Sequence, residues 1–586
     1  MSIIKKLIPL LFLKLFILIS AIPAFAEISP VSEETMSFDL GTTTMTTSLG
    51  RELTYTLNGG IRIPDSNNNP VVIFLHGSHP ITNSISDRYD LGFSYLMDDL
   101  ATQGYASVTL NVNIQYSFED GEPIETERLE DLFSKHIQSL IDANNGETSN
   151  YPIDLTGKLD LSNIILIGHS RSGQSIFDLY KLLYNDFDIE TKGLIAIAPS
   201  EMWLNDYENI KAPISIIVPE LDGDVILLDG QRIFDKMVIY GNPANEIQLI
   251  YLYNSNHNAF NTAVTRQDSS SIPTFDPNAI LISSEKQREF ASLYICEITK
   301  RMIDNVDLYT LSGSNELFGF KAMVSSYISG QTLVNAGSNS YNISTSGNVN
   351  ADDIIYSYMP SETQAGFFNH PGASQYIPLI NIKWHDSNGT VNFNSDDLWN
   401  LKSYDILNIY IASDSTDELA LGESKPFEIV LTDVSGNSSS YIIPNELHYI
   451  RFHPGELIVT EFSSFYSNFT PLGILPIPLL EFSDIDLENI VSIDFKLNQT
   501  KSGSLMLHSI SAGGKAIENN IADNDSTETN HDLSSDDIST DNTSNDAVSN
   551  DSTNSLSITF ILLISLSIIF ILGICIVLHR KIFSKK

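Results

Sequence analysis

Hydrophobic positions in the first half of the chain form two alternating kinds of run. Short, continuous apolar runs are typical of strands buried on both faces, and longer stretches repeat apolar residues every three or four positions, as one face of a helix does. The alternation predicts a mostly parallel sheet with helices on both faces over residues 51–335. Strands are expected at residues 71–75, 105–112, 163–167, 193–198, 214–218 and 247–253, and helices at 91–100, 125–143, 172–184 and 284–304.

The helical spacing disappears from about residue 336. Short apolar runs separated by Asn, Asp, Gly and Ser take over, with clear turn sequences at residues 386–389 and 435–437. The pattern predicts an all-β sandwich or jelly roll over residues 336–515. Its strands are expected at residues 377–384, 406–411, 427–431, 447–452, 490–497 and 505–510.

The start of the chain carries membrane-type sequence. Residues 1–26 place two lysines before an apolar run that ends in Ala24-Phe25-Ala26, the order of a secretory signal peptide. Lys14 interrupts the run, so an uncleaved anchor is the alternative. The Ser/Thr-rich residues 27–50 lack clear periodicity and are expected to form a leader.

The far end predicts a membrane anchor. Residues 516–555, rich in Asp, Asn, Ser and Thr, bury too little apolar surface to fold, so an acidic disordered linker is expected. Residues 556–578 carry no charge and are long enough to form a helix across ~30 Å of hydrocarbon. The basic tail at 579–586 belongs on the cytoplasmic side, so we expect a single-pass cell-membrane protein with its folded domains outside.

The net charge and the two cysteines bear on which partners and which cross-links the protein can have. The formal net charge of −41 argues against nucleic acid as a partner, because a phosphate-binding protein needs a basic face. Cys296 lies in a predicted soluble helix and Cys575 in the predicted membrane span, so the two are not expected to pair. Neither a disulfide framework nor a Cys–His metal site is predicted.

The sharpest chemical motif is Gly168-His169-Ser170-Arg171-Ser172. A predicted strand ends there, a serine follows between small residues, and a helix begins, which is the setting of a nucleophile elbow. The strained turn needs small residues two places before and after the nucleophile, and Gly168 and Ser172 satisfy this. Such a match also occurs by chance, so the strand–turn–helix context carries the prediction that Ser170 is the nucleophile.

A serine hydroxyl needs a base that a third group orients. In nucleophile-elbow enzymes the acid and the histidine follow the serine along the chain. Asp222, just past a predicted strand, is the expected acid, with Asp224 as the alternative and an Asp-Gly turn as the non-catalytic reading. His257 follows the next strand and is the only histidine between Asp222 and His370, so it is the expected base rather than an exposed loop histidine.

Stabilising an oxyanion takes two backbone N–H groups. One is expected from Arg171, directly after the nucleophile, and the other from Ser78, where Gly77 lets the backbone turn closely. A shift of one residue in this loop would make His79 the donor instead. His76 in the same loop is expected to be a structural hydrogen-bonding residue.

Together these motifs resemble those of bacterial secreted α/β-hydrolases of the esterase, lipase and polyester-hydrolase group, whose elbow reads GHSRGG and whose histidine loop reads NHN before an aromatic residue. Here residues 168–173 read GHSRSG and residues 256–260 read NHNAF. The resemblance covers about residues 51–310 and implies an α/β-hydrolase fold with Ser170, Asp222 and His257 as its triad. The departure at Ser172 leaves substrate preference open.

The predicted β-region is similar, more weakly, to the galactose-binding-like sandwiches that accompany some of these enzymes. Residues 427–433 and 503–507 carry that likeness. The usual Asp-Asp pair is absent and His508-Ser509 stands there, so calcium is not predicted. The likeness implies that this domain holds the enzyme near a surface glycan or polymer.

The sequence therefore predicts an α/β-hydrolase fold plus a C-terminal all-β sandwich and a single transmembrane helix. The expected activity is a cell-surface serine hydrolase, carboxylesterase-like or lipase-like, acting without cofactor or metal on ester-type small molecules or polymers. A serine peptidase or amidase would use the same groups. The alternative from another class is a catalytically inactive surface adhesin or glycan-binding protein on a hydrolase scaffold.

Overall fold

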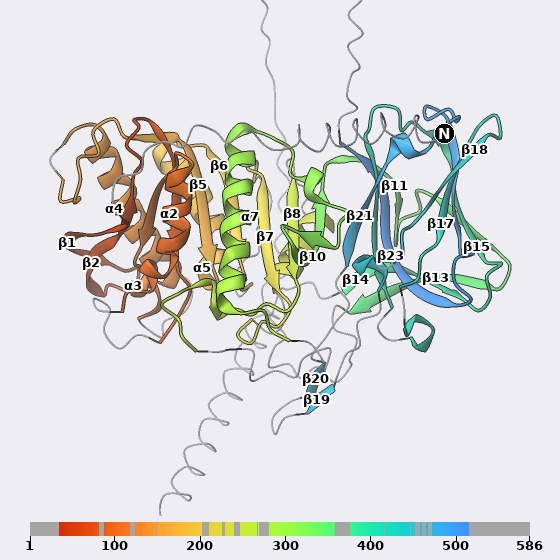
Figure 1. Cartoon of the computed structure of the whole chain (residues 1–586), viewed down its shortest axis with the longest axis horizontal. Helices are drawn as coiled ribbons and strands as arrows, with labels where there is room; N and C mark the ends of the chain where they lie inside the picture. The colour runs from red at the N-terminus through yellow and green to blue at the C-terminus, as the bar shows by residue number, and fades with distance from the viewer. Residues whose placement is uncertain are drawn as a thin grey trace, which may run out of the picture. The chain divides into compact units, whose positions relative to one another are not determined.

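The computed structural model shows where most of the predicted elements lie (Figure 1). It describes residues 34–514 apart from residues 81–86, 118–123, 148, 202–209, 226–228, 240–245, 267, 269–279, 358–375, 415–416, 423, 446, 452–456, 460–463 and 467–471. The signal peptide predicted at 1–26 and the linker, span and tail predicted at 516–586 lie outside the described residues. Within the described part of the chain, no helix is long and apolar enough to cross a membrane.

A ten-stranded sheet runs through the first part of the chain in the order β1-β2-β4-β3-β5-β6-β7-β8-β10-β9. The central strands from β4 to β8 pair in parallel, and antiparallel strands close both edges. The predicted mostly parallel sheet is therefore confirmed. Its strands are β1 (Met36–Thr46), β2 (Glu52–Arg62), β3 (Asn69–Leu75), β4 (Ala106–Leu110), β5 (Leu159–His169), β6 (Thr191–Ile197), β7 (Ile214–Pro219), β8 (Ile247–Leu252), β9 (Glu316–Leu317) and β10 (Phe320–Tyr327).

Helices cover both faces of this sheet because successive strand residues point to opposite sides. In β3, Val71, Ile73 and Leu75 join one apolar cluster with α4, α5 and α6. Val72 and Phe74 join a second cluster with α2 and α7. The helices are α2 (Ser94–Thr102), α3 (Asn113–Tyr116), α4 (Ile124–Asn144), α5 (Arg171–Phe187), α6 (Asp229–Ile239) and α7 (Ser284–Asp304), with 3-10 turns η1 (Tyr89–Phe93), η2 (Asn258–Phe260) and η4 (Tyr309–Leu311).

The leader predicted over residues 27–50 needs correction, because residues 36–46 form the edge strand β1. This strand pairs antiparallel with β2, with Met36 opposite Ile61. Phe38 and Met45 are buried, while most threonines of the strand face outward. Threonine fits an exposed strand face well, so a Ser/Thr-rich stretch without a strong apolar alternation conceals an edge strand.

The second part of the chain forms two antiparallel sheets, one in the order β13-β14-β23-β16-β21, with β11 also paired to β23, and one in the order β12-β15-β22-β17-β18. Side chains from both sheets share one apolar cluster, as in a sandwich. The strands are β11 (Gly330–Asn335), β12 (Asn342–Ser346), β13 (Val349–Ser357), β14 (Tyr376–Trp384), β15 (Thr390–Trp399), β16 (Ile406–Ser413), β17 (Glu428–Asp433), β18 (Ser438–Ile442), β21 (Gly473–Pro478), β22 (Ile490–Lys496) and β23 (Gly503–Gly513), beside a hairpin of β19 (Leu457–Val459) and β20 (Ser464–Tyr466).

Two details of the predicted β-region are wrong. Strand β11 already pairs with β23 of the sandwich, so the chain enters this region before residue 336. The strand predicted at residues 447–452 is instead a 3-10 turn, η6 (His448–Ile450). Its buried Tyr449 donates from its hydroxyl to the carbonyl of Val324 in β10, so this apolar run serves a contact between sheets rather than a strand. Two further 3-10 turns are η5 (Glu418–Ala420) and η7 (Leu479–Glu481).

Candidate active site

Ser170 sits in the tight turn between β5 and α5. Its φ of 58° and ψ of −123° are unusual for a residue with a side chain. Strain of this kind marks functional sites when the surrounding fold imposes it. The Ser170 N–H donates to the carbonyl of Ile197 at 2.9 Å, which fixes the turn at the carboxyl ends of β5 and β6.

The small residues beside Ser170 have distinct reasons to be small. A Cβ at Gly168 would lie 2.2 Å from the carbonyl oxygen of Ser172, so no larger residue fits. Ser172 is buried, and its hydroxyl donates to the carbonyl of His76 at 2.6 Å. The Tyr116 hydroxyl lies 2.9 Å from the Ser172 oxygen. Ser172 therefore ties the elbow to the loop after β3, a contact that glycine at this position would lack.

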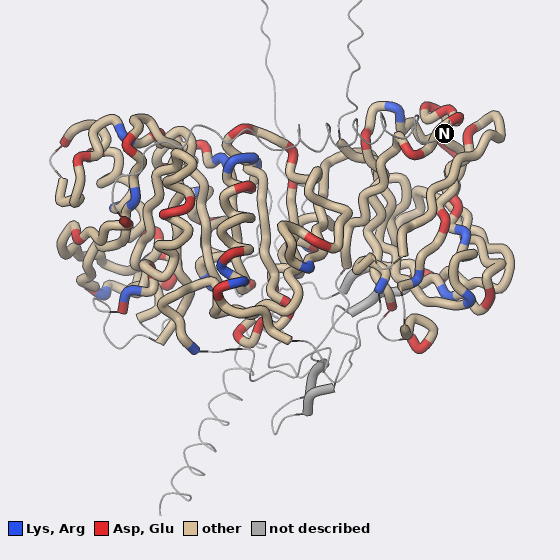
Figure 2. The backbone as a smooth tube through the Cα atoms, viewed as in Figure 1, with Lys and Arg blue, Asp and Glu red and all other residues tan. Residues whose placement is uncertain are grey.

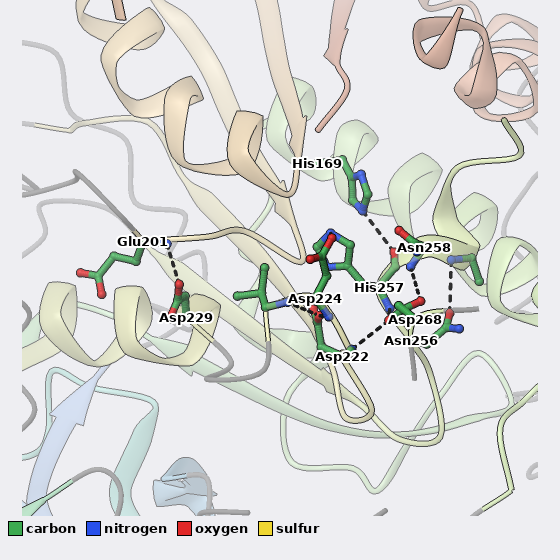
Figure 3. A network of polar contacts seen from close by, with 12 residues as sticks. His169, Glu201, Asp222, Asp224, Asp229, Asn256, His257, Asn258 and Asp268 are labelled. Atoms are coloured by element: carbon green, nitrogen blue, oxygen red, sulfur yellow. Dashed lines mark hydrogen bonds and ion pairs between the residues drawn. The ribbon is translucent and has the colours of Figure 1, made fainter. Parts of the chain in front are cut away.

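Asp222 and His257 meet at the same edge of the sheet. Asp222 follows β7, His257 follows β8, and His257 Nδ1 lies 2.9 Å from Asp222 Oδ2, with both side chains buried (Figure 3). The other oxygen of Asp222 accepts the N–H groups of Asp224 at 3.0 Å and Val225 at 2.6 Å. Of the two carboxylates that the sequence left open, Asp222 makes the histidine hydrogen bond.

Asp224 lies on the other side of the imidazole. Its Oδ2 is 3.9 Å from His257 Nε2, too far for a hydrogen bond, and its side chain is 46% exposed. His257 Nε2 has no hydrogen-bond partner among the described residues, so the structure does not join it to Ser170. His169, next to Ser170, packs its ring 4.7 Å from that of His257, and its Nε2 lies 3.1 Å from the His257 carbonyl.

The charges around His257 favour its protonated form. Burial alone lowers the pKa of His257, but attraction by Asp222, Asp224 and Asp268 outweighs it and raises the pKa to about 9. For Asp222, burial raises the pKa against the attraction of His257. Burial holds the pKa of His169 well below its usual value, so this neighbour stays neutral. A neutral His257 is therefore the form that has to be generated for base catalysis.

The loop after β3 lies against the nucleophile. A Cβ on Gly77 would come within 2.5 Å of Ser170 Cβ, so the glycine permits this approach, and Ser78 follows directly. Arg171 is the first residue of α5, where N–H groups have no carbonyl one turn back in the helix. These positions suit the two predicted oxyanion donors, whose role stays a prediction.

Both ring nitrogens of His76 have hydrogen-bond partners. His76 Nδ1 lies 2.8 Å from the Gly77 carbonyl, and its Nε2 accepts the N–H of Val112 at 3.0 Å. These partners define a neutral tautomer with the proton on Nδ1, and burial lowers the pKa of His76 in agreement with it. His76 therefore shapes the loop beside Ser170.

A second buried polar cluster follows β6. The backbone N–H of Ser200 donates to the carbonyl of Ser170 at 3.2 Å, and Glu201 N–H donates to Asp229 Oδ2 at 2.8 Å (Figure 3). Arg232 pairs with both acids, at 3.2 Å from Glu201 and 2.9 Å from Asp229. These compensated charges hold the segment beside the nucleophile onto α6.

The sequence did not single out Asp268, which accepts the backbone N–H groups of His257 and Asn258, both at 3.0 Å, and that of Gly223 at 2.8 Å. No local pattern reveals it, because its partners lie 10, 11 and 45 residues away. Within the described residues, no group of three or more His, Cys, Asp or Glu side chains is arranged to hold a metal.

The chain resembles solved structures of esterases at low sequence identity. No protein-family model and no curated protein matches the chain. Among solved structures, a Pyrobaculum calidifontis esterase is 14% identical, with a TM-score of 0.28 over 46% of this chain and 86% of that one. A bacterial heroin esterase is 12% identical (TM-score 0.30, 50% and 90% covered), and an esterase from Rhizomucor miehei is 13% identical (TM-score 0.29, 46% and 85% covered).

The sheet order, with a strained serine between β5 and α5 and with Asp222 and His257 after later strands, is in itself the arrangement of an α/β-hydrolase fold.

Proposed function

We propose that this chain is a serine hydrolase that cleaves carboxylic esters, with Ser170 as nucleophile, His257 as general base and Asp222 as the orienting acid. The observation that carries the proposal is the buried 2.9 Å contact between Asp222 Oδ2 and His257 Nδ1, at the sheet edge where Ser170 occupies a strained turn. Burying a carboxylate and an imidazole together is costly unless each satisfies the other, and catalysis supplies a reason for the pair.

The proposed reaction begins with proton transfer. Asp222 accepts a hydrogen bond from His257 Nδ1–H and keeps the proton on that nitrogen. The lone pair on Nε2 is then free to take the Ser170 proton as the Ser170 oxygen attacks the ester carbonyl. His257 then gives that proton to the departing alcohol, which leaves an acyl-enzyme on Ser170. Water, activated by the same histidine, hydrolyses the acyl-enzyme and releases the acid.

Two groups complete this scheme. The N–H groups of Ser78 and Arg171 are the proposed donors to the tetrahedral oxyanion. The hydrogen bond between Ser170 and His257 Nε2 forms in the proposed substrate complex, since such contacts are often long without substrate and tighten on binding.

The proposal extends to where the enzyme acts. The predicted signal peptide and membrane span would place the hydrolase at the cell surface, and the sandwich would hold it near a polymer or glycan. Glycan binding by the sandwich is tested by measuring whether the full chain is retained on an insoluble glycan, compared with an equally acidic control protein. Loss of retention in the presence of the soluble glycan supports binding, and equal retention of both proteins contradicts it.

Ester hydrolysis is tested on the full chain with p-nitrophenyl esters of increasing acyl length, beside the corresponding anilides. Ser170→Ala is compared with Ser162→Ala, a matched substitution at an exposed serine on β5, the strand that ends just before Ser170. We expect ester turnover that is lost only in Ser170→Ala. Faster turnover of anilides would indicate an amidase or peptidase, and no turnover of either class would favour the adhesin alternative.

A further inference from the structure

One buried carboxylate joins the two loops that carry the proposed acid and base. Asp268 is 1% exposed. Its Oδ2 accepts the N–H of Gly223, next to Asp222, at 2.8 Å and the N–H of His257 at 3.0 Å. Its Oδ1 accepts the N–H of Asn258 at 3.0 Å (Figure 3). A single side chain therefore bonds to the backbone of the acid loop and of the histidine loop.

The arrangement constrains both loops. A buried carboxylate is costly unless it is hydrogen-bonded, and N–H donors to a charged acceptor form stronger bonds than those to a neutral one. Three N–H groups that donate to Asp268 belong to Gly223, His257 and Asn258. Sliding one loop relative to the other would break at least one of these bonds to the buried carboxylate.

We propose that Asp268 is a positioning residue that holds Asp222 Oδ2 on His257 Nδ1 by fixing the backbone beside each. The effect of Asp268 on catalysis rests on the proposed function. Its effect on the contact between Asp222 and His257 does not. The 2.9 Å contact between Asp222 and His257 joins side chains from two separate loops, after β7 and β8. Misplacement by about 1 Å can cost a reaction about a hundredfold in rate.

Asp268 is one of several charged or titratable groups around His257. Asp222 faces Nδ1 at 2.9 Å, and Asp224 faces Nε2 at 3.9 Å. The neutral ring of His169 packs against the imidazole at 4.7 Å, and burial lowers the pKa of His79 to about 3, so that ring is neutral as well. Removing the charge of Asp268 while these groups remain is expected to make His257 easier to deprotonate.

The first test reads His257 directly. The full chain is labelled with ¹⁵N-histidine, and His257→Gln assigns the resonance. Asp268→Asn is compared with Asp160→Asn, where the carboxylate also accepts a backbone N–H, that of Ser162 at 3.1 Å, but in an exposed bond at the start of β5. In Asp268→Asn we expect the His257 titration to move down by about one pH unit and the Nδ1 proton resonance to lose its downfield shift. Asp160→Asn should change neither.

The second test is kinetic. On the high-pH plateau, where His257 is neutral in parent and variant, Asp268→Asn should lower kcat for ester hydrolysis by about tenfold or more, with KM changed by less than about threefold. Asp268→Glu keeps the charge on a longer side chain and serves as the second variant if Asp268→Asn does not fold. We expect it to lower kcat while leaving the His257 titration close to that of the parent.

The outcomes separate the two proposals. A lower melting temperature with an unchanged His257 titration and unchanged kcat would make Asp268 merely structural and overturn the inference. If the parent chain hydrolyses no ester but the His257 titration still shifts in Asp268→Asn, the positioning role is upheld while the proposed function fails.

Discussion

At the scale of single residues, the site depends on which imidazole nitrogen each carboxylate meets. Asp222 contacts Nδ1 inside the protein, whereas Asp224 is half-exposed and 3.9 Å from Nε2. The first position orients the ring, and the second adds only attraction to a positive charge. Two aspartates separated by a single glycine are therefore expected to have different roles.

Replacing Asp222 tests the orienting role. Asp222→Asn removes the acceptor that keeps the His257 proton on Nδ1, so the wrong tautomer becomes accessible. We expect kcat to fall by about 10³-fold to 10⁴-fold. Steady-state kinetics on a p-nitrophenyl ester measure it, and a fall smaller than about tenfold would remove Asp222 from the proposed mechanism.

Asp224 is the matched control and carries a pH prediction. Neutral His257 is the base, so kcat/KM should rise with pH through the pKa of His257, which the surrounding carboxylates raise to about 9. Asp224→Asn removes one attracting charge, lowers that pKa and moves the rise to lower pH, with kcat on the plateau changed by less than about threefold. A pH profile that does not move would show that Asp224 exerts no field on the imidazole.

The sequence could predict the residues whose chemistry is marked by local context. Ser170 lies between a strand and a helix, and Asp222 and His257 follow strands, so pattern and order placed all three at one edge. Asp268 had no such context, because its role comes from contacts with two distant loops. The sequence predicted only that Ser172 has to be small. It could not predict the hydrogen bond of the Ser172 hydroxyl, because the acceptor, the His76 carbonyl, is 96 residues away.

At the scale of elements, the turn between β5 and α5 governs the site. The strand delivers the serine to the sheet edge, and the helix begins at the next residue, so the chain reverses within a very small space. Gly168 is in contact with the carbonyl of Ser172 across this turn. The geometry leaves no freedom for a side chain at residue 168.

Gly168→Ala should therefore disrupt the elbow. The added methyl group would sit 2.2 Å from the Ser172 carbonyl oxygen, which forces the backbone to shift. We expect a loss of about 3 kcal/mol in the free energy of unfolding, measured by denaturant titration, together with loss of activity. Ser172→Gly, which removes the hydroxyl that contacts the His76 carbonyl and the Tyr116 hydroxyl, should cost about 1 kcal/mol and keep activity. Equal effects of the two would contradict this description of the turn.

Element prediction succeeded where burial is strong and failed at the edges. The run at residues 71–75 lies within β3, whose residues pack into cores on both faces. The edge strand β1 has one solvent-exposed face with several threonines, so its sequence lacks strong apolar alternation and predicts a leader instead of a strand. The run at 447–452 is apolar because Tyr449 and Ile450 are buried in the core, a cause that its sequence does not distinguish from a strand.

At the scale of the whole molecule, the sandwich is bonded to the α/β sheet at its β10 edge. The N–H of Ile474 in β21 donates to Ser325 Oγ in β10 at 3.1 Å, and the Tyr410 hydroxyl donates to Asp235 in α6. One apolar cluster contains side chains from both regions. Figure 2 shows acidic and basic positions interspersed over both regions. A mixed distribution of this kind favours a general role of the charged residues in keeping the protein in solution.

This junction predicts cooperative unfolding. Tyr410→Phe deletes a hydrogen bond to the buried carboxylate of Asp235 and should lower the free energy of unfolding by about 2 kcal/mol. Tyr441→Phe, at a partly exposed tyrosine on β18, is the control and should change little. Calorimetry should show one transition for both sheets, and two separate transitions would mean that the junction carries little stability.

The central claim, that Ser170 is an activated nucleophile, is tested most directly by locating a covalent adduct. The full chain is treated with a fluorophosphonate, digested and analysed by tandem mass spectrometry, beside the parent protein first inactivated by heat. We predict one phosphonylated residue, Ser170, formed only in the folded protein. Labelling of another serine, or no labelling of a folded chain that still hydrolyses esters, would contradict the account.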